Sequence, residues 1–134
     1  MTIEYALSSD YGWLRKHDRY VADEILKTKI EHREIYVVRD GDEITGWLRY
    51  NLFWDHIPFM NMLFLLEQYR NKGTGKKLVQ FWEDDMRKKG HDLVLTSTLS
   101  DESAQHFYRK LGYVENGALK YRDEALEIIF CRKL

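Results

Sequence analysis

One segment constrains the fold more than any other part of the sequence, because it joins an apolar strand to an amphipathic helix through a turn that contains two glycines. Residues 59–66 are apolar nearly throughout, as expected for a central strand that is buried on both faces. Gly73 and Gly75 follow, and residues 76–89 repeat apolar side chains at helical spacing up to a glycine at position 90. This order predicts a sheet packed against helices.

Hydrophobic periodicity on both sides of this segment predicts an alternation of strands and helices. Strands are expected over residues 2–7, 34–40, 43–54 and 59–66, from residue 93, and around 118–121 and 126–132, with a loop over 55–58. Helices are expected as two short segments between residues 8 and 30, over 76–89, and from a cap at Ser100 and Asp101 to Leu111. The order β-α-α-β-β-β-α-β-α-β-β indicates an α+β fold with a mixed sheet, in a single domain over residues 1–134.

The composition argues against several classes of protein. The 134 residues include 21 Lys plus Arg and 22 Asp plus Glu, and the formal net charge of −1 argues against a nucleic-acid binder. The only cysteine, Cys131, can form no internal disulfide, and without a cysteine cluster we expect no structural zinc or other metal. The longest unbroken apolar run, Met62–Leu66, is far shorter than a membrane span of about 20 residues, and the first residues do not resemble an export signal. We therefore expect a cytoplasmic protein that binds no membrane.

The glycine turn has the chemistry of a phosphate cradle. Because Gly73 and Gly75 have no Cβ, the backbone can approach a ligand closely, and the N–H groups and partial positive charge of the following helix favour an anion. A diphosphate is the expected ligand; the alternative is a tight turn that needs glycine only for its geometry. A P-loop is disfavoured because Arg70 and Lys77 occupy two of its defining positions, and a dinucleotide fingerprint because Leu78 replaces its third glycine.

A second segment makes this interpretation more specific. Residues 70–75 read Arg-Asn-Lys-Gly-Thr-Gly, and residues 104–113 read Ala-Gln-His-Phe-Tyr-Arg-Lys-Leu-Gly-Tyr. In this order and spacing the two motifs resemble the GNAT superfamily of acyl-CoA-dependent N-acetyltransferases. The resemblance covers nearly the whole chain and implies a GNAT-like fold, with a mostly antiparallel sheet of about seven strands flanked by about four helices.

The resemblance also implies how acetyl-CoA binds. Strand 59–66 should splay from its parallel neighbour at 93–97, so that the pantetheine lies between them and bonds the backbone near Leu63, Phe64 and Leu65. The pyrophosphate should be held by the turn and the start of the helix, namely Arg70, Asn71, Lys72, Gly73, Thr74, Gly75 and Lys76.

Tyr108 is the residue to which the resemblance assigns the role of general acid toward the departing thiolate. A phenol with a pKa near 10 is a suitable donor to a thiol group of pKa about 8.5 to 9. The alternative is a core aromatic residue, since Tyr108 lies at i+4 from Ala104 on the predicted helix.

Two positions depart from the family pattern. Asp101 stands where many members have an asparagine that bonds coenzyme A, and a carboxylate accepts hydrogen bonds but does not donate them. Thr96 stands where the branch resembling ribosomal-protein acetyltransferases has a catalytic glutamate, which disfavours membership of that branch.

The general base has several candidates. Asn61 is the only polar side chain on its face of strand 59–66; it could orient a water or the amine but is not a base near neutral pH. Asp55 and His56 in the expected loop, and His17 and Asp18 in the first helical segment, could accept the proton, although each is also explained as a solvated loop or cap residue.

The acceptor pocket is expected on the strand that carries Trp47 and Arg49, next to Asp55, because aromatic walls and these charges suit a small amine. We therefore expect an N-acetyltransferase that uses acetyl-CoA and a small-molecule primary amine, without a covalent enzyme intermediate, as a monomer or homodimer. The alternatives are acetylation of a protein amine and an acyl-CoA-binding module without turnover. The intact Tyr108 favours catalysis over the last.

Overall fold

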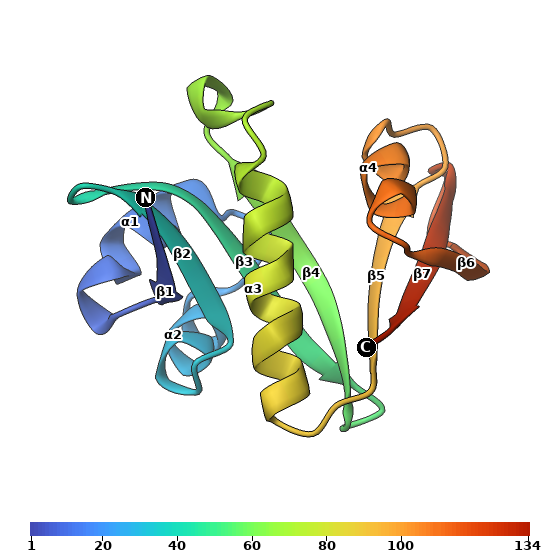
Figure 1. Cartoon of the computed structure of the whole chain (residues 1–134), viewed down its shortest axis with the longest axis horizontal. Coiled ribbons are helices and arrows are strands. Elements are labelled where there is room, and N and C mark those ends of the chain that lie inside the picture. The colour runs from blue at the N-terminus through green and yellow to red at the C-terminus, as the bar shows by residue number, and fades with distance from the viewer. The chain divides into compact units, whose positions relative to one another are not determined.

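The computed structural model describes residues 1–134, and its elements follow the predicted order (Figure 1). The strands are β1 (Thr2–Tyr5), β2 (Ile35–Asp40), β3 (Glu43–Phe53), β4 (Ile57–Leu65), β5 (Leu93–Leu99), β6 (Val114–Lys120) and β7 (Leu126–Lys133). The helices are α1 (Tyr11–His17), α2 (Asp23–Glu31), α3 (Thr74–Lys88) and α4 (Ala104–Lys110), with 3-10 turns at Ser8–Asp10 and Glu67–Tyr69.

The seven strands form one mixed sheet in the order β1-β2-β3-β4-β5-β7-β6. β4 and β5 run parallel, with Phe59 opposite Leu95 and Met60 opposite Thr96. The pairs β1–β2, β2–β3, β5–β7 and β6–β7 are antiparallel. The predicted α+β class, the mixed sheet and the GNAT-like element order are therefore confirmed.

The chain divides into two compact units, which are described in turn. Unit 1 comprises Met1–Tyr50 and Met62–Val79, and unit 2 comprises Asn51–Asn61 and Gln80–Leu134. The expectation of a single domain stays a prediction.

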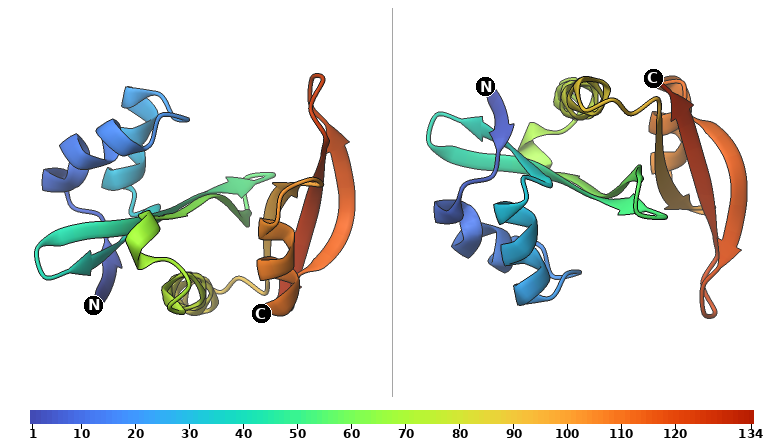
Figure 2. Two further views of the ribbon diagram at one scale, coloured as in Figure 1. Left: turned by 90° about the horizontal axis from the view of Figure 1, so that it is seen from above. Right: turned by 90° about the horizontal axis from the view of Figure 1, so that it is seen from below.

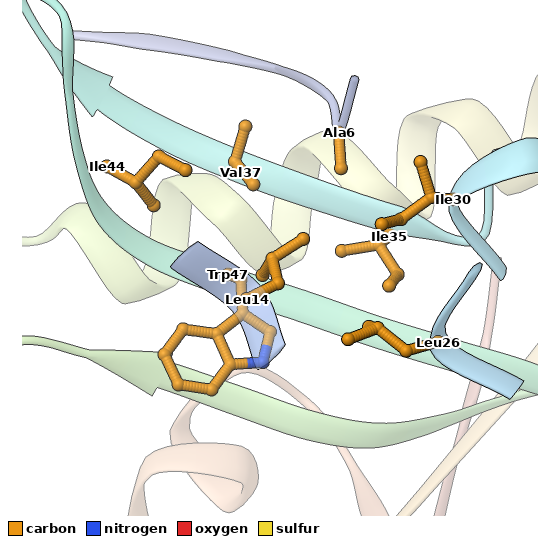
Figure 3. Close-up of a cluster of buried hydrophobic side chains, with 8 residues drawn as sticks. All are labelled: Ala6, Leu14, Leu26, Ile30, Ile35, Val37, Ile44 and Trp47. Carbon is orange, nitrogen blue, oxygen red and sulfur yellow. The ribbon is translucent and has the colours of Figure 1, made fainter. Parts of the chain in front are cut away.

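The core of unit 1 lies where α1 and α2 cover one face of β2 and β3 (Figure 2). Ile35 and Val37 of β2 alternate on the face that points into it, whereas Ile44 and Trp47 of β3 are three residues apart because the β2–β3 register shifts between Val38 and Arg39. Figure 3 shows its buried side chains, which are Ala6, Leu14, Leu26, Ile30, Ile35, Val37, Ile44 and Trp47. The predicted break between two short helices is confirmed, because α1 ends at His17 and α2 begins at Asp23.

A buried ion pair adjoins this core. Asp18, at the end of α1, is 2% exposed, and its Oδ2 accepts hydrogen bonds from Arg49 Nε at 2.8 Å and from Trp47 Nε1 at 3.1 Å. Arg49 Nη2 also donates to Asp18 Oδ1 at 3.2 Å. Both oxygens of a desolvated carboxylate are thus satisfied by β3, which fixes the end of α1 to the sheet.

The connection between β3 and β4 is shorter than predicted. The expected loop over residues 55–58 is wrong, because β4 begins at Ile57 and His56 N donates to Phe53 O at 3.2 Å. Trp54 and Asp55 have φ values of 53° and 66°, the two left-handed positions of a type I′ turn. Such a turn usually contains Asn or Gly, so no local pattern indicated it.

β4 is also less buried than predicted. Pro58 and Met60 are buried, but Asn61 is exposed and Phe64 is 37% exposed, so the strand is not covered on both faces. A continuous apolar run does not distinguish a fully buried strand from one whose second face stays open.

In unit 2 a buried polar cluster connects α3 to the C-terminal strands. Glu83, 1% exposed, accepts hydrogen bonds from Tyr113 Oη at 2.7 Å and from Arg132 Nη1 at 2.6 Å. Trp82 and Met86 of α3 are fully buried, as their helical spacing predicted.

α4 begins later than predicted. Its first residue is Ala104, and Ser103, not Ser100 or Asp101, precedes it. Ser100 lies in the preceding turn, where its carbonyl accepts from Gln105 Nε2 at 2.8 Å. The predicted cap was wrong because Ser and Asp favour turns as readily as caps.

The Asp18–Arg49 pair predicts a large difference between two arginine substitutions. Arg49→Met should lower the free energy of unfolding by about 3 to 5 kcal/mol, because it leaves a buried carboxylate without its charge partner. Arg15→Met is the matched control, since Arg15 pairs with Asp23 at 2.9 Å but both side chains are about half exposed, so solvent screens the pair and its loss should change the free energy of unfolding little. Urea unfolding measures both changes. Equal losses for the two variants would contradict a structural role for the buried pair.

Candidate active site

The turn between β4 and α3 has the backbone geometry of an anion site. Asn71 and Gly73 adopt left-handed φ values of 61° and 82°. The helical hydrogen bonds begin with Lys77 N donating to Gly73 O at 3.2 Å. Amides that precede the first bond of a helix have no acceptor within it, so those of residues 74–76 lack an intrahelical partner at the helix start.

Space and charge at this turn also suit a diphosphate. A Cβ built on Gly73 would meet no atom within 4 Å, so the backbone there is open to a ligand. Lys72, Lys76 and Lys77 are exposed around it. Thr74 is 2% exposed and its hydroxyl has no hydrogen-bond partner, which marks an unsatisfied polar group at the first residue of α3. The residues present therefore fit the pyrophosphate of coenzyme A.

Arg70 connects this turn to the end of β4. Its Nε donates to Leu65 O at 2.8 Å, and its guanidinium lies 4.9 Å from the centre of the Phe64 ring. Arg70 thus holds the turn in place through one hydrogen bond and one cation–π contact. Its expected contact with phosphate, and those of Leu63, Phe64 and Leu65 with pantetheine, stay predictions.

Tyr108, on α4 in unit 2, is 6% exposed and packs among aromatic rings. Its ring centre lies 5.6 Å from that of Tyr113 and 6.5 Å from that of Phe130. On the adjacent strand, Thr96 Oγ1 donates to Met60 O at 3.1 Å, which ties β5 to the start of β4. Tyr108 is therefore held where the two parallel strands meet.

Burial changes the acidity of this phenol. Desolvation raises the pKa of Tyr108 to about 12, and a hydrogen bond with Thr96 opposes the rise. The hydroxyl therefore stays protonated through the whole neutral range, so it is available as a donor. It is also a weaker acid than the free phenol of the sequence-based expectation.

The opposite face of unit 2 gathers polar side chains from four strands. Asn61 Nδ2 donates to Asn51 Oδ1 at 2.8 Å, so the predicted orienting residue already has a partner on β3. Ser97 of β5 donates to Glu127 Oε1 of β7 at 3.4 Å. Glu127 was not among the residues predicted from the sequence, since no motif marks it and only the β5–β7 register brings it to Ser97.

The remaining predicted residues have local partners. His17 stacks on Trp13 with ring centres 3.7 Å apart, and its Nδ1 lies 2.8 Å from Trp13 O. His56 Nδ1 lies 2.8 Å from Trp54 O. Asp55 is an exposed turn residue, and Asp101 is exposed before α4. Asp18, Arg49 and Trp47 form the buried cluster of unit 1, so their roles as base and as acceptor-binding residues stay predictions.

The structure contains neither a helix suited to span a membrane nor a group of side chains suited to bind a metal ion. No helix combines the length and the apolar character needed to cross a bilayer. No group of three or more His, Cys, Asp or Glu side chains is arranged to hold a metal ion, and Cys131 is a free, partly buried thiol.

Known proteins with similar sequences or structures point to one family. Residues 2–113 match the model of the Acetyltransferase (GNAT) family. N-alpha-acetyltransferase 30 of Schizosaccharomyces pombe is 34% identical over 56 residues, which is 41% of this chain but only 37% of that protein's length. The structure of Ard1 from Thermoplasma volcanium superposes with a TM-score of 0.84 at 19% identity, over 99% of this chain and 97% of that one. A Salmonella typhimurium protein solved with its cofactor acetyl-CoA gives a TM-score of 0.78 at 17% identity, over 99% and 93%.

The two structural matches agree with the fold described above, and the family match covers most of the sequence. The chain therefore belongs to the acetyltransferase (GNAT) family.

Proposed function

We propose that the chain transfers the acetyl group of acetyl-CoA to the primary amine of a small molecule by direct attack of the amine on the thioester. The observation that carries this proposal is Tyr108, a protonated phenol buried at the meeting point of β4 and β5. A module that only binds acyl-CoA has no need of a buried donor, whose desolvation costs stability unless it is bonded.

The proposal assigns the diphosphate of acetyl-CoA to the turn and helix start over residues 71–76. This assignment is supported by the left-handed residues Asn71 and Gly73, the open space beside Gly73 and the exposed lysines nearby. When bound, acetyl-CoA supplies an activated acyl group; the chain supplies binding, orientation and proton transfer.

Tyr108 is assigned the task of donating to the sulfur as the thiolate leaves. With a pKa of about 12 the phenol is a weaker acid than the thiol, so its proton moves to the sulfur only as the C–S bond breaks and the thiolate forms. A hydrogen bond from the phenol to the developing thiolate stabilises the transition state before any transfer is complete.

A protein N-terminal amine is the second candidate acceptor. The observation that favours it is the partial match to N-alpha-acetyltransferase 30, which spans 41% of this chain. A panel that includes small amines, with and without a carboxylate, and short peptides with free N-termini separates the two acceptors. Thiol released from acetyl-CoA is the measurement: we expect turnover with a small amine, whereas turnover with peptides alone would overturn the small-molecule assignment.

Gly73→Val should weaken acetyl-CoA binding at least tenfold, because the new side chain strains a left-handed backbone and fills the space assigned to phosphate. Gly41→Val is the matched control: Gly41 also has a left-handed φ, 63°, and open space, but it lies in the β2–β3 turn. Calorimetric titration measures both affinities. Wild-type affinity in a folded Gly73→Val protein would place the diphosphate elsewhere.

Tyr108→Phe should lower kcat by roughly 10² to 10⁴ with little change in acetyl-CoA affinity, the usual contribution of a general acid. The deficit should shrink as the pH rises toward the thiol pKa, since a stable thiolate leaves without a donor. Tyr113→Phe removes another buried hydroxyl, the one that donates to Glu83, and should lower the melting temperature while leaving kcat within about threefold of wild type.

The pH–rate profiles of the three proteins decide between chemistry and packing. A Tyr108→Phe enzyme as fast as wild type at neutral pH, with chemistry rate-limiting, would leave Tyr108 with a packing role alone.

A further inference from the structure

We propose that Glu127 of β7 is the general base that deprotonates the acceptor amine; this inference rests on the acetyl transfer proposed above. Glu127 faces away from Tyr108, on the other side of the same sheet, and lies next to β5. The register, the surroundings of its carboxylate and the chemistry of the reaction support the assignment in turn.

The strand register fixes the face on which Glu127 lies. In β5 and β7, Thr96 is opposite Phe130, Ser97 is opposite Ile129 and Leu99 is opposite Glu127. Opposite residues share a face and successive residues alternate, so Glu127 lies with Ser97 and Leu99. The bond from Ser97 Oγ to Glu127 Oε1, at 3.4 Å, agrees with this diagonal placement.

Tyr108 belongs to the other face. It contacts Phe130 and bonds Thr96, and these two residues are opposite each other across β5 and β7. Thr96 and Ser97 are consecutive, so the strand turns one toward the phenol and the next toward the carboxylate. Tyr108, the proton donor to the leaving group, and Glu127, the proton acceptor from the nucleophile, therefore lie on opposite faces of β5.

The last residue pair of the β4–β5 ladder joins Met60 to Thr96, so Ser97 is the first β5 residue beyond it. Asn61, one residue after Met60, lies on the same face as Ser97 by the parallel register, and its amide is held by Asn51. We place the acceptor amine on this face, which also carries the Glu127 carboxylate.

The surroundings of Glu127 make it more basic than an exposed glutamate. Oε2 is buried and has no hydrogen-bond partner, while Oε1 faces Ser97. The other charged groups near it are also acidic: Glu102, before α4, and Glu124, in the β6–β7 connection. Burial first, and then these two carboxylates, raise the pKa of Glu127, whereas Ser97 lowers it. A carboxylate poorly solvated in this way accepts a proton from an ammonium more readily.

The proton balance of the reaction closes with these two side chains. The ammonium gives one proton to Glu127 Oε1, and the nitrogen lone pair forms the N–C bond. The C–S bond breaks as the carbonyl re-forms, and the sulfur takes the Tyr108 proton. The amide nitrogen loses its second proton through solvent to the phenolate, and Glu127 releases its proton to water, so each turnover yields one amide, one thiol and one proton.

Three of the other carboxylate and imidazole candidates are held by local contacts. Asp18 has both oxygens bonded by Arg49, and the Nδ1 atoms of His17 and His56 lie against backbone carbonyls. Glu127 differs from them in having a carboxylate oxygen that no donor satisfies.

The test is Glu127→Gln, which keeps the shape of the side chain and removes its basicity. We expect kcat with the best amine to fall by roughly 10² to 10⁴ at neutral pH, with acetyl-CoA affinity unchanged. The acid limb of kcat/KM should move up to the pKa of the amine, because the substrate must then lose its proton unaided. Asp123→Asn is the control, since it removes an exposed carboxylate in the β6–β7 connection that is not among the groups raising the pKa of Glu127, and it should keep kcat within about twofold.

A second measurement needs no turnover and no altered side chain. Carboxyl carbon-13 NMR of the wild-type protein should show Glu127 titrating above the ordinary glutamate range, and its resonance should shift when the acceptor amine is added. An ordinary titration with no response to the amine, or a folded Glu127→Gln enzyme with wild-type kcat and acid limb, would overturn the assignment. If Tyr108→Phe is still slow in that case, the proposed acetyl transfer stands without Glu127; if no amine is acetylated by the wild type, the proposed function itself fails.

Discussion

The alternation of side chains along β5 is the constraint on which the chemistry depends. Successive residues of a strand point to opposite faces, so one strand can serve two environments at once. Thr96 meets Tyr108 in an aromatic, desolvated setting, and Ser97 meets Glu127 among polar groups. Because Met60 pairs with Thr96 in parallel, the step from Thr96 to Ser97, where the side chains change face, lies beside β4. The proposed acid and base therefore need no mobile element to reach opposite sides of a reacting thioester.

Buried charges have different roles in the two units. In unit 1 Asp18 is fully paired by Arg49 and Trp47, and this pairing fixes the end of α1 to the sheet. In unit 2 Glu83 is likewise satisfied, by Tyr113 and Arg132. Glu127 alone among these carboxylates keeps an oxygen without a donor. An oxygen without a hydrogen-bond donor thus distinguishes the proposed base from the structural carboxylates better than burial does.

The sequence predicted the element order and the fold class because apolar periodicity and glycine positions are local signals. The left-handed Gly73 and the buried face of α3 followed from such signals. Three features of the structure could not be predicted from local signals. The type I′ turn at Trp54 and Asp55 uses residues that rarely occupy it, the partner of Arg49 lies 31 residues away, and Glu127 meets Ser97 only through a register set by the whole sheet. Long-range pairing of this kind leaves no pattern in a single sequence.

The most direct test of this account is a crystal structure of the chain with coenzyme A and an amine acceptor. We predict the sulfur within hydrogen-bond reach of the Tyr108 hydroxyl on one face of β5, and the amine nitrogen within reach of Glu127 Oε1 on the other, directly or through one water. A sulfur atom remote from Tyr108, or an amine bound on the Tyr108 face with Glu127 unengaged, would contradict the division of acid and base between the two faces.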